Sequence, residues 1–314
     1  MKVVSTFAGC GGSSLGYEQA GCEVVAAVEW DPHAAMCYRL NHPRTHVFEG
    51  DIAHATGEKI LNATGLDVCE LDILDGSPPC QGFSTAGHRV LDDPRNALFQ
   101  QHMRLVRELR PKHVVIENVS GMIKGKMKAV AGEVVASLKA EGYRVVAGLM
   151  EAQYFGVAQL RPRVFFIGSR VGQPMLPRPT SRPIPCREAL ADVEPDEILT
   201  PDSAGSRLMA THLRPGENGS DVMLRIGRKD GWFNISMLHP DRLSPTIVKQ
   251  DRGGNTLWHW ERRHVSIREA LVLTGFPPDY QLPGKFSDRW ARVGNSVAPP
   301  MSREIGRMLG RLHG

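Results

Sequence analysis

The sequence predicts an α/β protein with one large sheet-and-helix domain and a smaller irregular unit. Short β-branched apolar runs alternate with helical stretches through the first half of the chain, which is typical of strand–helix units. Several of these runs end in a glycine turn or a carboxylate, as strands do at a ligand-binding edge. At Gly172 the composition changes to a proline-rich stretch over 173–185, which indicates a joining loop. A chain of 314 residues with 41% hydrophobic content is long enough for both parts.

Charge and cysteine usage narrow the class of protein. The net charge is +4 and the pI is near 8.8, which permits a polyanionic partner without establishing one. The six cysteines show no CxxC spacing, so neither a zinc site nor a disulfide framework is indicated and a reducing compartment is expected. The sequence shows no basic-then-apolar leader and no apolar run of membrane-spanning length. We therefore expect a cytosolic protein, or a nuclear one in a eukaryote.

The chain begins with a strand, a glycine turn and a helix. The strand covers 2–7, the turn covers 7–16, and a helical stretch continues to Ala20. The turn does not match GxGxxG, and a purely structural tight turn is the alternative to a ligand-binding one.

The next two predicted strands end in acids. Strand 23–28 leads to Glu29, which could accept hydrogen bonds from both ribose hydroxyls of a nucleoside. Asp31, next to a proline, is better explained as a helix N-cap. Strand 45–49 leads to Asp51, which could accept a hydrogen bond from an adenine amino group. A glycine turn and two acids at consecutive strand ends predict an adenosyl-ligand crevice.

The stretch Gly76–Ser84 follows the apolar run Leu71–Leu74, so Cys80 comes just past the carboxyl end of a strand. Two prolines before the thiol stiffen the backbone, and small residues after it leave room for a ligand. This context favours a nucleophile. The alternative is a buried cysteine that acts as a small hydrophobe.

A helix over 97–110 and a strand over 113–116 place Glu117 at another carboxyl end. An unpaired buried carboxylate is costly, so Glu117 is either solvated or functional.

A helix over 126–139 and a strand over 143–149 precede Arg161 and Arg163, which lead into a strand over 164–167. The two arginines are expected on the same side of an extended segment. They are either surface charge or a clamp on a phosphate or a catalytic carboxylate.

The smaller unit lacks long periodic segments. Residues 203–263 hold 10 basic and 6 acidic residues, and such a mixture with aromatics can contact phosphates and base edges. The alternative is a small subdomain packed on its own tryptophans. The aromatic residues and the flexible polar loop are Trp232, Phe233, Trp258, Trp260 and 252–255.

Towards the end of the chain we expect a capped helix from Ser266 to Thr274 and a last helix from about Ser302. Between them, 294–300 is expected to form a rigid turn.

Five blocks resemble the ordered motifs of the DNA (cytosine-5)-methyltransferase family. They occur in family order over nearly the whole chain, and the proline–cysteine and glutamine–arginine blocks are highly specific. The blocks are Phe7-Ala8-Gly9-Cys10-Gly11-Gly12, Pro78-Pro79-Cys80-Gln81-Gly82-Phe83-Ser84, Glu117-Asn118-Val119, Gln159-Leu160-Arg161-Pro162-Arg163 and Gly294-Asn295-Ser296-Val297. Ser5-Thr6 depart from the acid and leucine usual in the family, but they lie behind the turn.

The resemblance implies a doubly wound mixed sheet of the S-adenosylmethionine-dependent methyltransferase type with a smaller, irregular target-recognition domain. The implied domains are 1–173 for catalysis and cofactor binding, 174–257 for target recognition, 258–285 for a hinge and supporting helix, and 286–314 for a C-terminal segment that returns to the catalytic domain.

The resemblance also implies a covalent mechanism. Cytosine C5 is too weak a nucleophile to take a methyl group directly, so Cys80 is expected to add to C6. Glu117 would hold or protonate N3, with Arg161 and Arg163 orienting it and Arg163 favouring the thiolate. The base must leave the duplex stack, and the loop over 81–96 is the candidate lid.

The implied methyl donor is S-adenosylmethionine, which becomes S-adenosylhomocysteine, and no metal is expected. The implied partner is double-stranded DNA with a specific short target, with a cognate restriction endonuclease as a further candidate partner. We expect a monomer without membrane association, bacterial or phage-encoded, in the cytoplasm and at the nucleoid when on DNA. The implied cofactor contacts are Phe7, Gly9, Gly11, Glu29, Trp30, Asp51, Pro78, Leu98 and Asn295.

Three alternatives remain. A tRNA cytosine methyltransferase shares the catalytic residues and differs in how it accepts folded RNA. A catalytically silent DNA-binding relative is disfavoured by the intact set Cys80, Glu117, Arg161 and Arg163. A nicotinamide dehydrogenase would explain the glycine turn and Glu29 but would leave the other motifs without a role.

Overall fold

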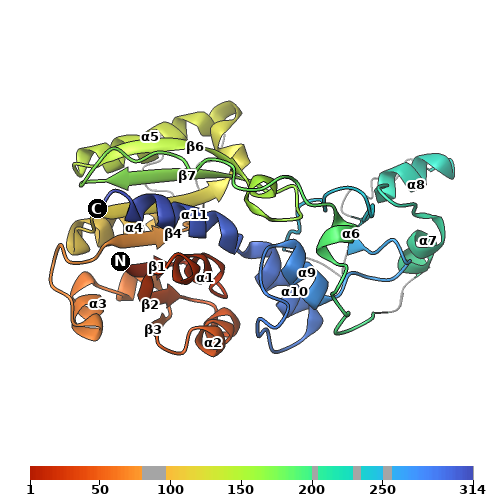
Figure 1. Ribbon diagram of the computed structural model, residues 1–314, viewed down its shortest axis with the longest axis horizontal. Helices are drawn as coiled ribbons and strands as arrows, with labels where there is room; N and C mark the ends of the chain where they lie inside the picture. The colour runs from red at the N-terminus through yellow and green to blue at the C-terminus, as the bar shows by residue number, and fades with distance from the viewer. Residues whose placement is uncertain (80–96, 200–203, 229–234, 250–256, 314) are drawn as a thin grey trace. The chain divides into compact units, whose positions relative to one another are not determined.

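The computed structural model describes residues 1–79, 97–199, 204–228, 235–249 and 257–313. It forms two compact units: unit 1 holds 1–151, 162–178 and 297–314, and unit 2 holds 152–161 and 179–296 (Figure 1). Some sequence predictions concern residues outside the described ranges. They are those for Cys80, the lid over 81–96, Trp232, Phe233 and the loop 252–255.

A seven-stranded sheet forms the centre of unit 1, in the order β3-β2-β1-β4-β5-β7-β6. The strands are β1 Lys2–Thr6, β2 Glu23–Glu29, β3 His46–Glu49, β4 Ile73–Gly76, β5 His113–Val119, β6 Arg144–Glu151 and β7 Pro162–Ser169. Strands β1 to β5 are parallel, and β7 runs antiparallel to both β5 and β6. The chain winds outward from β1 to β3 and then returns to β4 beside β1, so the predicted doubly wound mixed sheet is confirmed.

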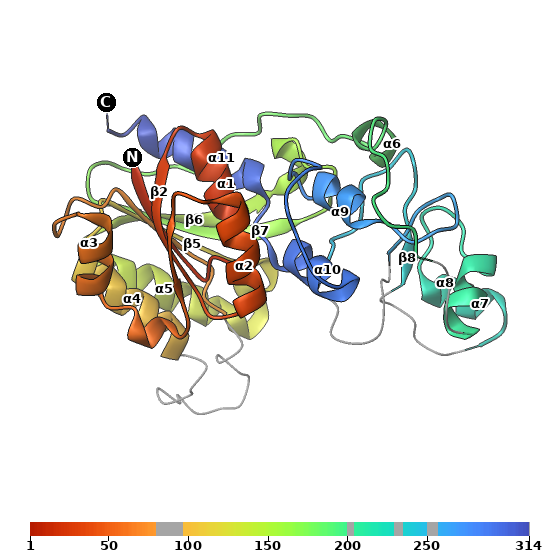
Figure 2. The same cartoon turned by 90° about the horizontal axis from the view of Figure 1, so that it is seen from below.

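Helices cover both faces of this sheet. α1 and α11 lie on one face, and α3, α4 and α5 lie on the other (Figure 2). The helices of unit 1 are α1 Gly12–Gln19, α2 Pro32–Asn41, α3 Gly57–Thr64, α4 Ala97–Leu109, α5 Lys128–Ala140 and α11 Pro299–Gly310. Because side chains alternate along a strand, Val4 and Leu74 join the main apolar core with α4 and α5, whereas Ser5 and Asp75 point to the opposite face.

The packing of α1 on α11 requires a glycine. A Cβ atom on Gly16 would lie 2.2 Å from the carbonyl oxygen of Pro299 and 2.8 Å from Cβ of Ser302. The two helices, distant in the sequence, therefore approach at backbone contact and fix the closing segment of the chain on unit 1.

Unit 2 is built from short elements around a small core, as its composition predicts. Its elements are α6 Cys186–Ala189, α7 Ala204–His212, α8 Gly219–Arg225, β8 Ser236–Met237, β9 Leu257–Trp258, α9 Ile267–Leu273 and α10 Phe286–Asn295. Met209, Val222, Met237 and Trp258 are buried together in one cluster. Trp258 is only 1% exposed, so this tryptophan serves the core of the subdomain.

The C-terminal elements differ from the sequence prediction. The capping box of Ser266 and Glu269 starts α9 as expected. The prediction missed α10, whose N-cap Lys285 makes no side-chain cap. The expected rigid turn over 294–300 is wrong in extent, because α10 continues to Asn295 and α11 already begins at Pro299. Proline is well suited to a first helical position, since its missing N–H would have no helical partner there.

The two units cut across the domain boundaries expected from the sequence. Residues 152–161 belong to unit 2, and the segment 286–314 divides, with 286–296 in unit 2 and 297–314 in unit 1. The functions assigned to these segments stay predictions.

Candidate active site

Several predicted site residues of unit 1 lie at or just after the carboxyl ends of parallel strands. These ends meet at one edge of a sheet, and β1 and β4 flank the point where the winding reverses. This edge therefore collects the glycine turn after β1, the acids after β2 and β3, and the segment after β4 that leads to Cys80.

The glycine turn depends on backbone conformations that glycine adopts without strain. Gly9 and Gly11 have φ of +58° and +99°, and the N–H of Gly11 donates to the carbonyl of Ala8 at 3.0 Å. A Cβ atom on Gly9 would meet nothing within 4 Å. Phe7 also has a positive φ, +53°, which is unusual for a bulky residue. The turn thus presents open backbone in front of Gly9.

Glu29 is buried and holds this turn. Its Oε2 accepts from the N–H of Gly9 at 2.7 Å, and its Oε1 accepts from the N–H of Asp31 at 2.9 Å. A carboxylate at the end of a strand is a common acceptor for ligand hydroxyls. Asp31 caps α2 by accepting from the N–H of Ala34 at 3.0 Å, so its interpretation as an N-cap is confirmed.

Two further predicted contacts lie at the ends of neighbouring strands. Trp30, directly after β2, is 75% exposed, so a large aromatic face is open to a ligand. Asp51 follows β3, and its Oδ1 accepts from the N–H of Ala53 at 2.9 Å. Leu98, in the first turn of α4, is partly buried against the main core.

The segment before Cys80 is tied to the strand that carries Glu117. The side-chain amide of Asn118 donates to the carbonyl of Pro78 at 2.9 Å. The structure thus joins two blocks that the sequence places far apart, β4 with its proline segment and the Glu117-Asn118-Val119 block.

Glu117 and Arg163 form an ion pair across β5 and β7. Arg163 Nε lies 2.9 Å from Glu117 Oε1, and the side chains are 13% and 11% exposed. Arg163 faces Val119 in the register of the two strands, so its side chain reaches Glu117 diagonally. Of the two alternatives for Arg163, the clamp on a carboxylate is the arrangement found.

Arg161 makes its hydrogen bonds to different residues, of unit 2. Its guanidinium donates to the carbonyls of Ile247, Gly294 and Ser296 at 2.8, 2.9 and 2.6 Å. The residue is 1% exposed, so it is not surface charge. These bonds hold the turn that carries the predicted cofactor contact Asn295, which is exposed at the end of α10.

Asp75 is a residue that the sequence analysis missed. It lies in β4 and is 4% exposed. Its Oδ2 accepts from Ser13 Oγ at 2.7 Å and from Ser5 Oγ at 3.3 Å, and its Oδ1 accepts from the hydroxyl of Tyr17 at 3.0 Å. A strand assigned to 71–74 ended one residue too early to show an acid inside the sheet.

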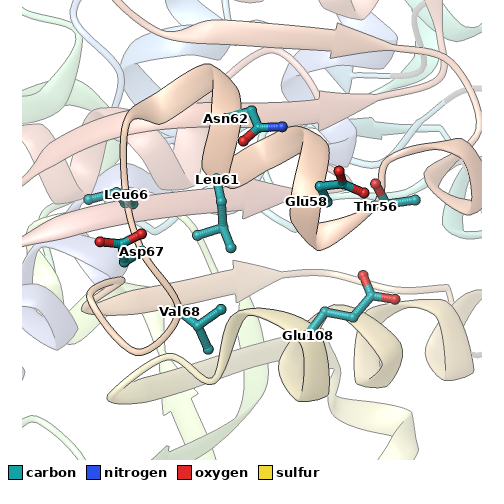
Figure 3. Close-up of a pocket in the computed structure, with 8 residues that line it drawn as sticks. All are labelled: Thr56, Glu58, Leu61, Asn62, Leu66, Asp67, Val68 and Glu108. Carbon is teal, nitrogen blue, oxygen red and sulfur yellow. The ribbon is translucent and has the colours of Figure 1, made fainter.

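The described ranges contain no group of three or more His, Cys, Asp or Glu side chains placed to hold a metal ion. In the same ranges, no helix is both long and apolar enough to cross a membrane. A cavity of about 550 Å³ lies between α3, the loop after it and α4 (Figure 3). None of the predicted site residues lines this cavity, so it is separate from the expected adenosyl crevice.

Comparison with known proteins agrees with this architecture. The chain is 43% identical over 192 residues to the type II methyltransferase M.AquIA of a Picosynechococcus species, covering 58% of this chain and 77% of that protein. It is 30% identical over 354 residues to the type II methyltransferase M.XorII of Xanthomonas oryzae, covering 98% of this chain and 84% of that protein. A solved E. coli structure, a candidate DNA modification methyltransferase encoded within a prophage, matches 100% of this chain and 99% of that chain, with a TM-score of 0.74 and 25% identity.

The doubly wound mixed sheet, with its glycine turn and acids at the switch-point edge, matches the fold of this solved methyltransferase. The family model of C-5 cytosine-specific DNA methylases matches residues 1–311. The chain belongs to this family, and it is an S-adenosylmethionine-dependent DNA (cytosine-5) methyltransferase, as the motifs predict.

Asp75 gives the stability of the protein a defined pH dependence. Burial raises the pKa of its carboxyl from 3.8 to about 6; the hydrogen bonds from Ser13 and Tyr17 oppose this rise, and the nearby charge of Glu117 adds to it. The folded chain therefore binds this proton more tightly than the unfolded chain. The resulting stabilisation is complete below the unfolded value and is lost as the pH rises through about 6.

We predict that Asp75→Asn removes the loss of stability that accompanies the rise in pH. The free energy of unfolding of the variant should rise relative to the wild type by on the order of 3 kcal/mol between pH 4 and pH 7. Denaturant titrations of both proteins at a series of pH values measure the difference. A difference that stays constant over this range would contradict the prediction.

Proposed function

We propose that this enzyme methylates a cytosine turned out of duplex DNA, through a covalent bond between Cys80 Sγ and C6 of the ring. The observation that carries the proposal is the ion pair of Glu117 with Arg163, together with the bond from Asn118 to Pro78. A carboxylate is thereby kept beside the segment that leads directly to Cys80, although an unpaired acid would be costly at this depth.

The residue types suit the chemistry of a weak nucleophile. Addition of the Cys80 thiolate to C6 forms the S–C6 bond, and Glu117 gives a proton to N3, so C5 becomes electron-rich. After C5 has gained the methyl group, a solvent water takes the C5 proton, the S–C6 bond breaks to restore the thiolate, and N3 returns its proton to Glu117. Arg163 holds Glu117 in place and, as a fixed cation, favours the thiolate form of a nearby cysteine.

The chain's own residues fit S-adenosylmethionine, which supplies an electrophilic methyl group when bound. The open backbone at Gly9 allows close approach of the ligand. The buried Glu29 carboxylate, held beside this turn by two backbone N–H groups, is the type of acceptor that binds a ribose diol at a strand end. The exposed ring of Trp30 is large enough to stack on adenine.

We predict that Glu29→Ala weakens S-adenosylmethionine binding by about 1.5–3 kcal/mol, which is the usual size of a hydrogen bond to a charged group. Calorimetry on the folded variant measures this. Asp31→Ala is the matched control, because it removes a neighbouring acid that caps α2, and its affinity should stay near wild type. Unchanged affinity in Glu29→Ala would refute the ribose assignment.

We further propose that residues 174–257 choose the DNA sequence. This stretch carries arginines and aromatic residues and none of the proposed catalytic ones, and side chains of these types can contact base edges. The named relatives are type II methyltransferases, so a cognate restriction endonuclease stays a predicted partner, as does the monomeric state.

Exchange of residues 174–257 for the corresponding segment of a relative should redirect methylation to the relative's site. Sequencing of methylated cytosines in DNA from expressing cells measures the outcome. If the active chimera still marks the original site, sequence choice lies elsewhere in the chain.

The covalent step gives the sharpest prediction. Cys80→Ser offers a hydroxyl with a pKa far above neutral, so methylation should fall by orders of magnitude while DNA binding survives. Glu117→Gln should also abolish turnover, because it removes the proton donor for N3. Transfer of a tritiated methyl group to DNA, with tRNA as the parallel substrate, measures both variants and separates a DNA enzyme from a tRNA enzyme.

DNA that contains 5-fluorocytosine supplies the control. Fluorine cannot leave as the C5 proton does, so the wild type should be trapped in a complex that resists denaturing electrophoresis, and Cys80→Ser should not. A trapped adduct on another cysteine, or substantial turnover by Cys80→Ser, would disprove the mechanism.

A further inference from the structure

Asp75 is a buried carboxylate whose hydrogen-bond donors are neutral hydroxyl groups. Three hydroxyl groups, those of Ser5, Ser13 and Tyr17, donate to its two carboxylate oxygens at 3.3, 2.7 and 3.0 Å. Among the described residues, no lysine or arginine forms an ion pair with it. A buried ionised group held by neutral donors is costly, and an apolar side chain of similar volume would serve the core of the sheet better.

The partners of Asp75 show what its carboxylate joins. Ser5 lies on β1 and is the direct register partner of Asp75 on β4. Ser13 and Tyr17 belong to the first two turns of α1, the helix that begins immediately after the glycine turn. Ser302 of α11 extends the cluster, with its Oγ 3.2 Å from Ser13 Oγ. One carboxylate therefore connects the start of α1 to the strand that leads to Cys80.

The opposite face of the same strand is fixed as well. The hydroxyl of Thr6 lies 3.1 Å from the carbonyl oxygen of Asp75 and 2.9 Å from Nδ1 of the buried His102. A Cβ atom on Gly76 would come within 2.4 Å of Thr6 Oγ1. These contacts fix β4 against β1 and α4. The hydrogen bonds from Ser13 and Tyr17 to Asp75 then set the position of α1 and its turn relative to β4.

We propose that Asp75 is a positioning residue for methyl transfer, which fixes the cofactor-binding glycine turn to the strand that carries the nucleophile. This inference rests on the proposed function, in which the turn holds S-adenosylmethionine and Cys80 attacks the base. A displacement of about 1 Å between reacting groups can reduce a rate by roughly 100-fold. A hydrogen-bonded carboxylate that joins α1 to β4 therefore has a functional benefit that outweighs its cost in stability.

The register of β1 and β4 provides a rescue experiment. Asp75→Ser removes the carboxylate but keeps a small polar side chain, and it should weaken S-adenosylmethionine binding by about tenfold, which corresponds to the loss of about one net hydrogen bond. In the double variant Ser5→Asp/Asp75→Ser the carboxylate moves to the neighbouring strand on the same face. This variant should recover affinity to within about threefold of wild type, because Ser13 and Tyr17 keep an acceptor.

Two single variants separate positioning from general packing. Asp75→Asn keeps the shape and offers one acceptor and one donor to the hydroxyls, so its affinity should remain within about threefold of wild type. Asp72→Ala removes a carboxylate just before β4 that contacts Lys2 and Lys112, and it should leave cofactor affinity unchanged. Calorimetry with S-adenosylmethionine, kcat and KM on DNA, and thermal unfolding are measured for each protein.

The double variant decides the outcome. The inference is supported if Asp75→Ser binds S-adenosylmethionine more weakly and the double variant recovers the affinity. It is also supported if Asp75→Ser alone fails to fold and the double variant folds and binds. Wild-type affinity and kcat in Asp75→Ser, or a double variant that binds weakly or does not fold, overturns it. If the wild type does not bind S-adenosylmethionine, or Glu29→Ala binds it normally, the proposed cofactor site fails instead.

Discussion

The contact of β1 with β4 is the constraint on which the catalytic unit depends. These strands are neighbours in the sheet although a second and third strand and three helices separate them in the sequence. Because they are parallel, the glycine turn after β1 and the proline segment after β4 leave the sheet at the same edge. In the proposed mechanism, the cofactor bound by one segment and the nucleophile carried by the other meet at this edge.

Three buried acids around this edge are held in three different ways. Backbone N–H groups hold Glu29, hydroxyls hold Asp75, and a guanidinium holds Glu117. Backbone donors fix a carboxylate without neutralising its charge, whereas an arginine fixes its position and balances its charge. The environments therefore suit different tasks, and the folded chain keeps each acid buried at a cost that a purely structural core would avoid.

The sequence predicted the strands of the large sheet and the glycine turn and acids at their ends, because local patterns determine these features. Glycine in the turn, Asp31 before Pro32 and the acids after β-branched runs are all visible without a structure. The elements that it missed depend on tertiary contacts. α10 has no capping side chain, and its helical residues are stabilised by one buried face with Trp290 and Val293. Asp75 was missed because the predicted strand ended at Leu74, and only the three-dimensional arrangement brings hydroxyls from β1 and α1 to it.

The two arginines show why spacing alone cannot assign a role. Residues two apart in an extended segment share a face, and this rule predicted equal surroundings for Arg161 and Arg163. The strand begins only at Pro162, so the rule does not apply across it. Arg163 inside β7 reaches Glu117, whereas Arg161 before β7 binds carbonyls of residues 247, 294 and 296. The buried guanidinium of Arg161 donates to three backbone carbonyls and so orders the segments that carry them. The guanidinium of Arg163 is ion-paired and orients a carboxylate. Arg163 is therefore the arginine that orients a carboxylate, and Arg161 is the one that fixes the turn around Asn295.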